Sequence, residues 1–181
     1  MSGAAEQGKG FDETRRVALI TKIAELQDDA TMLGAALWIG EYGGTADSPG
    51  ITAYMDAEYD GQGAVAAGSA YWAYDRDGGY GLLNSDGTEK TVLLDVVVRP
   101  YPTQVAGDPM SFSYAEDSGT FSVQWRPDPA IEATTEIAIP QRAYPDGYAV
   151  DCDGCQVERR PGRLLVWDVP AGDTATVVIT R

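Results

Sequence analysis

The 181-residue chain contains no histidine and only two cysteines. Without histidine, a Ser-His-Asp or Cys-His catalytic arrangement is excluded, as is any zinc site that uses a histidine ligand. Two thiols also fall short of the roughly four nitrogen or sulfur ligands that a structural zinc ion takes. Any acid or base chemistry must therefore rest on carboxylates, and we expect no metal site.

Positive charge is scarce, since 13 Lys and Arg residues stand against 28 Asp and Glu residues and leave a net charge of −15. Such a chain is a poor partner for nucleic acid, whose phosphates would be repelled. No apolar run approaches the ~18 residues of a membrane-spanning helix, and the N-terminal segment MSGAAEQGKG lacks the apolar stretch of a secretion signal. The residues leave the location of the chain unknown.

The two cysteines, Cys152 and Cys155, lie in the segment Asp-Cys-Asp-Gly-Cys. The Asp-Gly pair between the thiols indicates a turn, whereas a redox Cys-x-x-Cys motif usually opens a helix. A local disulfide and a structural pair of free thiols both fit this pattern. A disulfide implies an oxidising compartment, which disagrees with the missing secretion signal.

Helical and apolar segments alternate over about the first hundred residues. Apolar residues recur at three- and four-residue spacing in the helical segments, with Val17 and Ala24 on the apolar face of the first and Val92 on that of the last. We expect a helix at 11–29, a strand at 35–44, a helix at 51–61, a strand at 69–75 and a helix at 88–99. This order is typical of parallel βα units.

Short alternating strands replace the helical pattern from Thr103 onward. Turn signals such as Glu-Asp-Ser-Gly at 116–119 separate them. We expect strands at 110–114, 120–125, 135–139, 148–152, 164–169 and 174–180, which predict a small antiparallel β-sandwich. The predicted domains are 1–101 and 102–181.

Apolar residues of these strands are numerous enough for a modest core of their own. The tryptophans Trp38, Trp125 and Trp167 are also expected in the core. The expected core of the sandwich is Phe112, Tyr114, Phe121, Val123, Trp125, Ile137, Ile139, Leu165, Trp167, Val169, Val177 and Ile179.

Glu41 stands at the carboxyl end of the first predicted strand. Barrels of parallel strands and helices place catalytic groups at such ends, because the layers below are filled by packed side chains. Trp72 holds a corresponding place in the next strand, and its indole offers a flat apolar face to a sugar ring. Tyr42 and Tyr74 neighbour these two residues, either in a cleft or in ordinary packing.

Three segments resemble glycoside hydrolases of family 5, and most closely their endoglycoceramidase branch. They are Leu-Trp-Ile-Gly-Glu-Tyr-Gly-Gly at 37–44, Ala-Tyr-Trp-Ala-Tyr-Asp at 70–75 and Leu-Leu-Asp-Val-Val-Val-Arg-Pro-Tyr-Pro at 93–102. The resemblance implies the last strands of a (β/α)8 TIM barrel followed by a C-terminal β-sandwich. It implies a retaining glycosidase for glycolipids, with Glu41 as nucleophile, Trp72 as substrate platform, no cofactor and a secreted parent enzyme.

The sequence lacks one catalytic residue of the family, the acid/base glutamate. The acid/base glutamate of the family follows an asparagine, but Asn84 is the only asparagine here and no Asn-Glu pair occurs. The chain is therefore expected to be a C-terminal fragment that is inactive alone, with an open barrel edge available for association. A non-catalytic module that binds glycan or lipid, and an interaction protein that pairs through this edge, are the alternatives.

Overall fold

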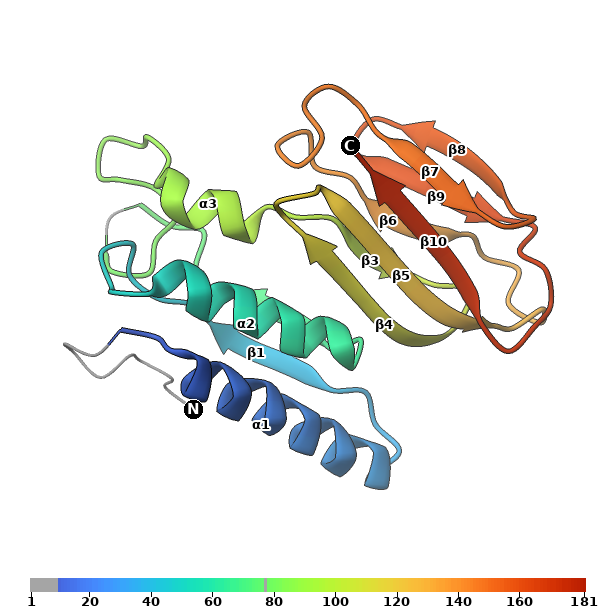
Figure 1. Ribbon diagram of the computed structural model, residues 1–181, viewed down its shortest axis with the longest axis horizontal. Coiled ribbons are helices and arrows are strands. Elements are labelled where there is room, and N and C mark those ends of the chain that lie inside the picture. The colour runs from blue at the N-terminus through green and yellow to red at the C-terminus, as the bar shows by residue number, and fades with distance from the viewer. Residues whose placement is uncertain (1–9, 77) are drawn as a thin grey trace. The chain divides into compact units, whose positions relative to one another are not determined.

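The computed structural model describes residues 10–76 and 78–181 of the chain (Figure 1). The chain divides into two units, Met1–Val97 and Val98–Arg181. Tyr101 begins a strand of the second unit, so the division lies a few residues before the predicted end of the first domain. Apart from Gly10, the segment considered above for a secretion signal lies outside the described residues.

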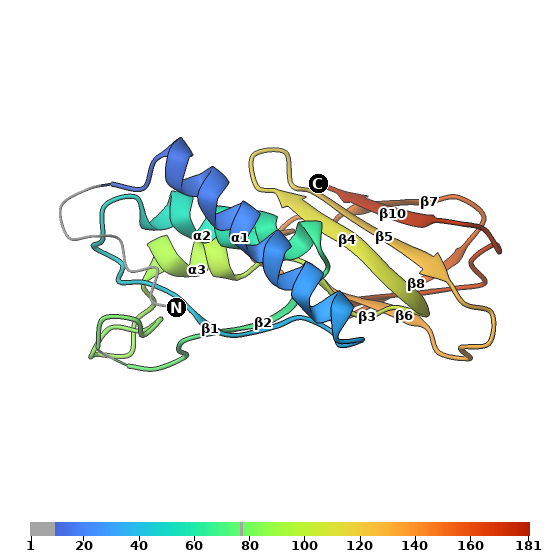
Figure 2. The ribbon, with the colours of Figure 1, turned by 90° about the horizontal axis from the view of Figure 1, so that it is seen from below.

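The described residues of the first unit form one parallel strand pair and three helices. Its elements are α1 (Glu13–Met32), β1 (Trp38–Tyr42), α2 (Ile51–Ala64), β2 (Gly68–Tyr71) and α3 (Thr91–Val97). Strands β1 and β2 are parallel and α2 connects them, so the predicted order of elements is confirmed. Figure 2 shows the helices on one face of the strand pair.

Helix α1 begins where Asp12 caps it, because the side chain accepts a hydrogen bond from Arg15 N at 3.0 Å. Helix α2 packs closely on α1 through Gly61. A β-carbon there would lie 2.7 Å from Cδ1 of the buried Ile23. This close approach explains why the glycine sits inside a helix that continues to Ala64.

Several details of the first unit differ from the prediction. Val17 and Val92 are 56% and 43% exposed, and Ala24 is exposed as well, so these three residues are not on buried helix faces. Helix α3 begins at Thr91 because Thr88 belongs to a preceding turn, where its N–H and hydroxyl donate to Asp86 Oδ1. Trp38 is 63% exposed, since its indole lies across Gly68 of β2, which has no side chain to cover it.

The second unit is an antiparallel β-sandwich. One sheet has the order β4-β5-β10-β7 and the other has the order β3-β6-β9-β8. Its strands are β3 (Tyr101–Gln104), β4 (Gly107–Ala115), β5 (Thr120–Pro127), β6 (Thr135–Ala138), β7 (Ala149–Cys152), β8 (Gln156–Arg160), β9 (Arg163–Trp167) and β10 (Ala175–Thr180).

The core of the sandwich is built from both sheets, and Trp125 and Phe121 are its largest fully buried side chains. The predicted core is confirmed except in β9, where Leu164 and Val166 point inward in place of Leu165 and Trp167. This is a shift of one residue, which exchanges the two faces of a strand. Three consecutive apolar residues fit either choice equally well.

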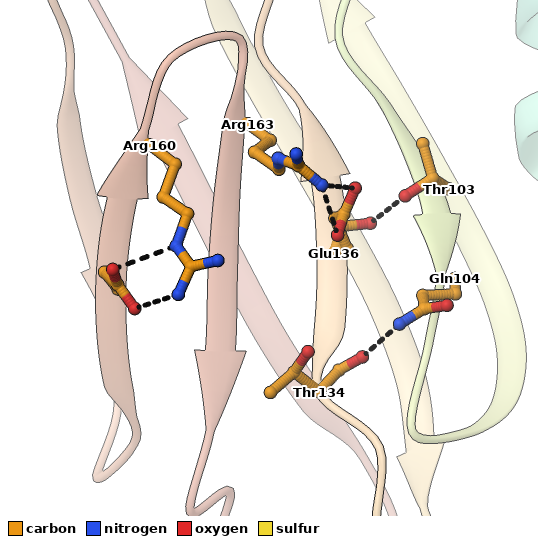
Figure 3. Close-up of polar contacts among 7 residues, drawn as sticks. Thr103, Gln104, Thr134, Glu136, Arg160 and Arg163 are labelled. Atoms are coloured by element: carbon orange, nitrogen blue, oxygen red, sulfur yellow. Dashed lines mark hydrogen bonds and ion pairs between the residues drawn. The ribbon is translucent and has the colours of Figure 1, made fainter.

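Strands β3 and β8 were not predicted, and both are edge strands of the same sheet. Pro102 in β3 and the charged residues of β8 are typical of sheet edges, which natural proteins protect with such residues. Figure 3 shows the polar contacts around them, including Arg163 with Glu136 at 3.3 Å and Arg160 with its strand neighbour Glu158 at 2.9 Å.

The outward-pointing Leu165 is nevertheless only 8% exposed. It is the cross-strand partner of Glu136 in β6 and of Glu158 in β8, so their side chains flank it on the same face. The ion-paired side chains of this sheet therefore pack beside an apolar residue.

Candidate active site at the ends of strands β1 and β2

Glu41 lies next to the last residue of β1 and its side chain is exposed. Its neighbour Tyr42 contacts α2, and the pairing with β2 is irregular between Ile39 and Tyr42. Among the residues that the structure describes, none forms a hydrogen bond or ion pair with the Glu41 carboxylate. A carboxylate held at a strand end without a partner is free to contact a ligand.

Trp72 follows β2 directly and lies beside the end of β1. Its backbone N–H donates to the Tyr42 carbonyl oxygen at 2.8 Å, and Tyr42 is also the cross-strand partner of Tyr71. The Trp72 side chain is 56% exposed. Because the strands are parallel, Glu41 and Trp72 both lie at the carboxyl end of the strand pair. The sequence predicted this from their positions near the ends of the two strands.

Close backbone contact between the two strand ends depends on Gly43. Its φ is +156°, and a β-carbon there would lie 2.6 Å from the Trp72 carbonyl oxygen and 3.2 Å from the Tyr71 ring. Any larger residue would push the segment after β2 away from β1. The glycine after the Glu-Tyr pair therefore helps to place Trp72 beside Glu41.

Tyr42, Tyr59 and Tyr71 form a cluster beside the carboxyl ends of the two strands. Tyr42 donates from its hydroxyl to the Tyr59 hydroxyl at 2.9 Å, and its ring meets the rings of Tyr59 and Tyr71 edge to face at 5.7 and 5.8 Å between centroids. Tyr71 donates to the Tyr80 carbonyl oxygen at 2.9 Å, and burial raises its pKa to about 12. Tyr42 thus supports the strand ends from the helix side.

Tyr74 does not belong to this cluster of tyrosines. It follows the end of β2 in the sequence, and its side chain is 77% exposed. The four predicted site residues are therefore divided. Glu41, Trp72 and Tyr74 are accessible, whereas Tyr42 is partly buried in the tyrosine cluster.

A buried polar network joins α2 to β2, and the sequence analysis did not identify it as a network. Glu58 is 6% exposed; it accepts from the Tyr54 hydroxyl at 3.0 Å and from Gln62 Nε2 at 3.3 Å. Ser69 of β2 donates to Gln62 Oε1 at 2.7 Å. Burial raises the pKa of the Glu58 carboxyl, and the two hydrogen bonds oppose that shift. The spacing of Tyr54, Glu58 and Gln62 every four residues was the available signal.

Cys152 and Cys155 are joined by a disulfide, with 5.8 Å between their α-carbons. The bond closes the turn through which the chain passes from β7 in one sheet to β8 in the other. Within residues 10–76 and 78–181, no group of three or more Cys, Asp or Glu side chains is arranged to hold a metal ion. No helix of the described part is long and apolar enough to cross a membrane.

Residues 99–179 match the glycoside hydrolase family 5 C-terminal domain. Most of the sandwich unit thus resembles the C-terminal domain of that family, in agreement with the resemblance seen in the sequence. The curated relatives are an endoglycoceramidase and a glucosylceramidase. Endoglycoceramidase I of Rhodococcus hoagii (strain 103S) is 41% identical over 86 residues, which cover 47% of this chain and 17% of the relative.

Solved structures extend the likeness over both units. Endo-glycoceramidase II from Rhodococcus sp., solved as a lactosyl-enzyme intermediate, has 32% sequence identity and a TM-score of 0.76, and the match covers 92% of this chain and 38% of that one. The same protein in complex with ganglioside GM3 gives 31% identity and a TM-score of 0.78, over 96% of this chain and 39% of that one. The sterylglucosidase 1 of Cryptococcus neoformans shares the fold, with 18% identity and a TM-score of 0.75, over 92% of this chain and 32% of that one. This chain thus spans well under half the length of these relatives and corresponds to a C-terminal part.

Proposed function

We propose that this chain is the C-terminal part of a retaining glycosidase that acts on glycolipids, with Glu41 as the catalytic nucleophile. The observation that supports this best is the exposed Glu41 carboxylate at the end of a parallel strand, beside Trp72 on the next strand. In this proposal, β1 and β2 are the last two strands of a (β/α)8 barrel, whose catalytic groups stand at the carboxyl ends of its strands.

The reaction proceeds in two displacements. A Glu41 carboxylate oxygen attacks the anomeric carbon, the bond from that carbon to the leaving oxygen breaks, and an acid residue protonates the leaving oxygen. The same residue, now a base, then removes a proton from water, which attacks the anomeric carbon and releases Glu41 as a carboxylate. The two carboxyl groups of such an enzyme stand about 5–5.5 Å apart.

Trp72 is proposed as the platform for the sugar whose bond is cleaved. Its side chain is more than half exposed, and an indole packs its apolar face against the C–H face of a pyranose. Tyr74, which is more exposed still, is proposed at the rim of the same cleft. Tyr42 is proposed to act indirectly by holding the ends of β1 and β2 through the tyrosine cluster.

The acid/base residue is not proposed within this chain. The family pattern places that glutamate after an asparagine, and the sequence contains no Asn-Glu pair. We therefore expect residues 1–181 alone to hydrolyse no glycolipid. The free edge of the β1–β2 pair is where further barrel strands, or another chain, would associate through main-chain hydrogen bonds.

The test is to trap the covalent intermediate in the full reading frame that contains this chain. A 2-deoxy-2-fluoro-β-lactoside with a good leaving group slows breakdown of the glycosyl-enzyme, so mass spectrometry of proteolytic peptides can locate the sugar. We expect the adduct on the peptide that contains Glu41 and none after Glu41→Gln, since an amide is a very poor nucleophile.

Glu116→Gln is the matched control, because Glu116 is an exposed glutamate in the sandwich unit. This variant should label as the wild type does. An adduct on another residue, or undiminished turnover by Glu41→Gln, would refute the assignment of the nucleophile.

A second candidate function is that of a non-catalytic module that binds glycan. It is favoured by one specific observation, a pocket in the sandwich unit that contains a tryptophan.

A further inference from the structure

The sandwich contains a pocket of about 280 Å³ at the end of its strands where β5 and β9 finish. Strand β10 begins opposite Trp125, near the end of β5, so the segments after β5 and after β9 meet there. The lining residues come from the end of β5 and the segment after it, from the end of β9 and the segment after it, and, with Ala106, from the β3–β4 connection. Its volume lies just below the range of drug-sized ligand sites, about 300–1,000 Å³, and suits a small ligand.

The lining combines one aromatic ring, two carboxylates and apolar surface. Trp167 is partly buried, and among the described residues its indole N–H has no hydrogen-bond acceptor. Asp128 and Asp168 are exposed, and the remaining walls are aliphatic or proline. Ile131 in this wall is 40% exposed. Within the described part of the chain, the residues that line the pocket thus supply an indole N–H without an acceptor, two carboxylates and apolar side chains.

The walls are held by hydrogen bonds within the protein. Ala106 accepts from Asp128 N at 3.1 Å and donates to the buried Thr135 Oγ1 at 3.0 Å, which fixes the strand ends. Asp128 Oδ1 accepts from Ala130 N at 2.9 Å, so the second carboxylate oxygen is available to a ligand. Asp168 has a φ of +52°, a backbone conformation that is uncommon outside glycine and recurs at ligand-binding sites.

We propose that this pocket binds one neutral sugar ring. The indole of Trp167 offers its face to the C–H face of the ring, and the carboxylates of Asp128 and Asp168 accept hydrogen bonds from sugar hydroxyls. A negatively charged ligand is disfavoured by both carboxylates and by the net charge of −15. A lipid chain is disfavoured because it would desolvate the carboxylates without giving them a donor.

A quaternary ammonium ion is the nearest competitor, since carboxylates and an indole also attract cations. Such ligands are held by cages of several aromatic rings, and Trp167 is the only aromatic residue among those that line this pocket. The neutral sugar therefore fits the lining better. The inference concerns the sandwich unit and does not depend on Glu41 or on the proposed hydrolysis.

The experiment is a titration of the full chain with lactose, followed by 1H–15N NMR spectra. At up to about 50 mM lactose we expect saturable shifts of the Trp167 indole N–H and of amides in 128–133 and 168–171, with a Kd on the order of 1–10 mM. Trp167→Ala should weaken binding about tenfold or more, because the ring face is lost. Asp128→Asn keeps the acceptor for Ala130 N and should weaken binding several-fold.

Two controls keep the result specific. Trp72→Ala should leave the lactose shifts in the sandwich unchanged, and unchanged amide signals of Val177 and Ile179 should show that the core of each pocket variant is folded. The proposal is overturned if lactose causes no saturable shifts, if the shifts surround Glu41 and Trp72 alone, or if choline chloride binds this pocket and lactose does not. Labelling of Glu41 in the trapping experiment is independent of all these outcomes.

Discussion

Gly43→Ala should destabilise the ends of β1 and β2, because the two backbones meet at this residue. The new β-carbon would lie 2.6 Å from the Trp72 carbonyl oxygen, whereas ordinary contact begins near 3.4 Å. The Gly43 and Trp72 backbones must therefore move apart by about 0.8 Å to reach ordinary contact. That movement stretches the 2.8 Å hydrogen bond from Trp72 N to the Tyr42 carbonyl oxygen beyond bonding distance.

The magnitude follows from two contributions. Loss of one backbone hydrogen bond costs about 0.5–1.5 kcal/mol. Forcing a methyl group into a packed site costs about 1–3 kcal/mol. Together they predict a loss of about 1.5–4.5 kcal/mol in the stability of the first unit.

Urea unfolding and hydrogen exchange of the Trp72 amide measure this loss. We expect a lower unfolding midpoint for Gly43→Ala and exchange of the Trp72 amide that is at least about tenfold faster. Gly40→Ala is the matched control in the same strand, since nothing lies within 4 Å of a β-carbon there. Equal stability of the two variants, or an unchanged Trp72 amide, would refute this account of how the strand ends are held.

Two further predictions concern the buried carboxylate and the disulfide. Because burial raises the folded-state pKa of Glu58 above its ordinary value of 4.5, its contribution to stability is fully present below pH 4.5 and is lost as pH rises through the raised value. Glu58→Gln should therefore gain stability relative to the wild type between pH 4 and 8 in urea unfolding; a difference independent of pH would contradict this. Replacing Cys152 and Cys155 together by serine should cost the sandwich about 2 kcal/mol, as for a short closed loop, and should abolish the effect of dithiothreitol on unfolding; an effect of the reductant that persists in the double variant would contradict this.

The order of elements could be predicted from the sequence because it depends on local patterns. Helical spacing in α1 and α2, the short apolar runs around β1 and β2, and the alternation after Thr103 each identify an element without its neighbours. The position of Glu41 at a strand end follows from the same local pattern.

Local patterns could not show which face of a strand points into the core. Leu-Leu-Val in β9 fits both registers, and only the facing sheet determines that Leu164 and Val166 enter the core. The edge strands β3 and β8 carry proline and charge in place of an apolar pattern, so their pairing with β6 and β9 is visible only in three dimensions.

The sequence by itself determined the types of element, the carboxylate at a strand end and the absence of histidine chemistry, since these are properties of residue type and spacing. Tertiary structure alone decided the contacts between distant segments. It placed Trp72 against Tyr42, joined Gln62 of α2 to Ser69 of β2, and brought Asp128 and Trp167 to one pocket. Such contacts depend on packing across the fold, which no local pattern encodes.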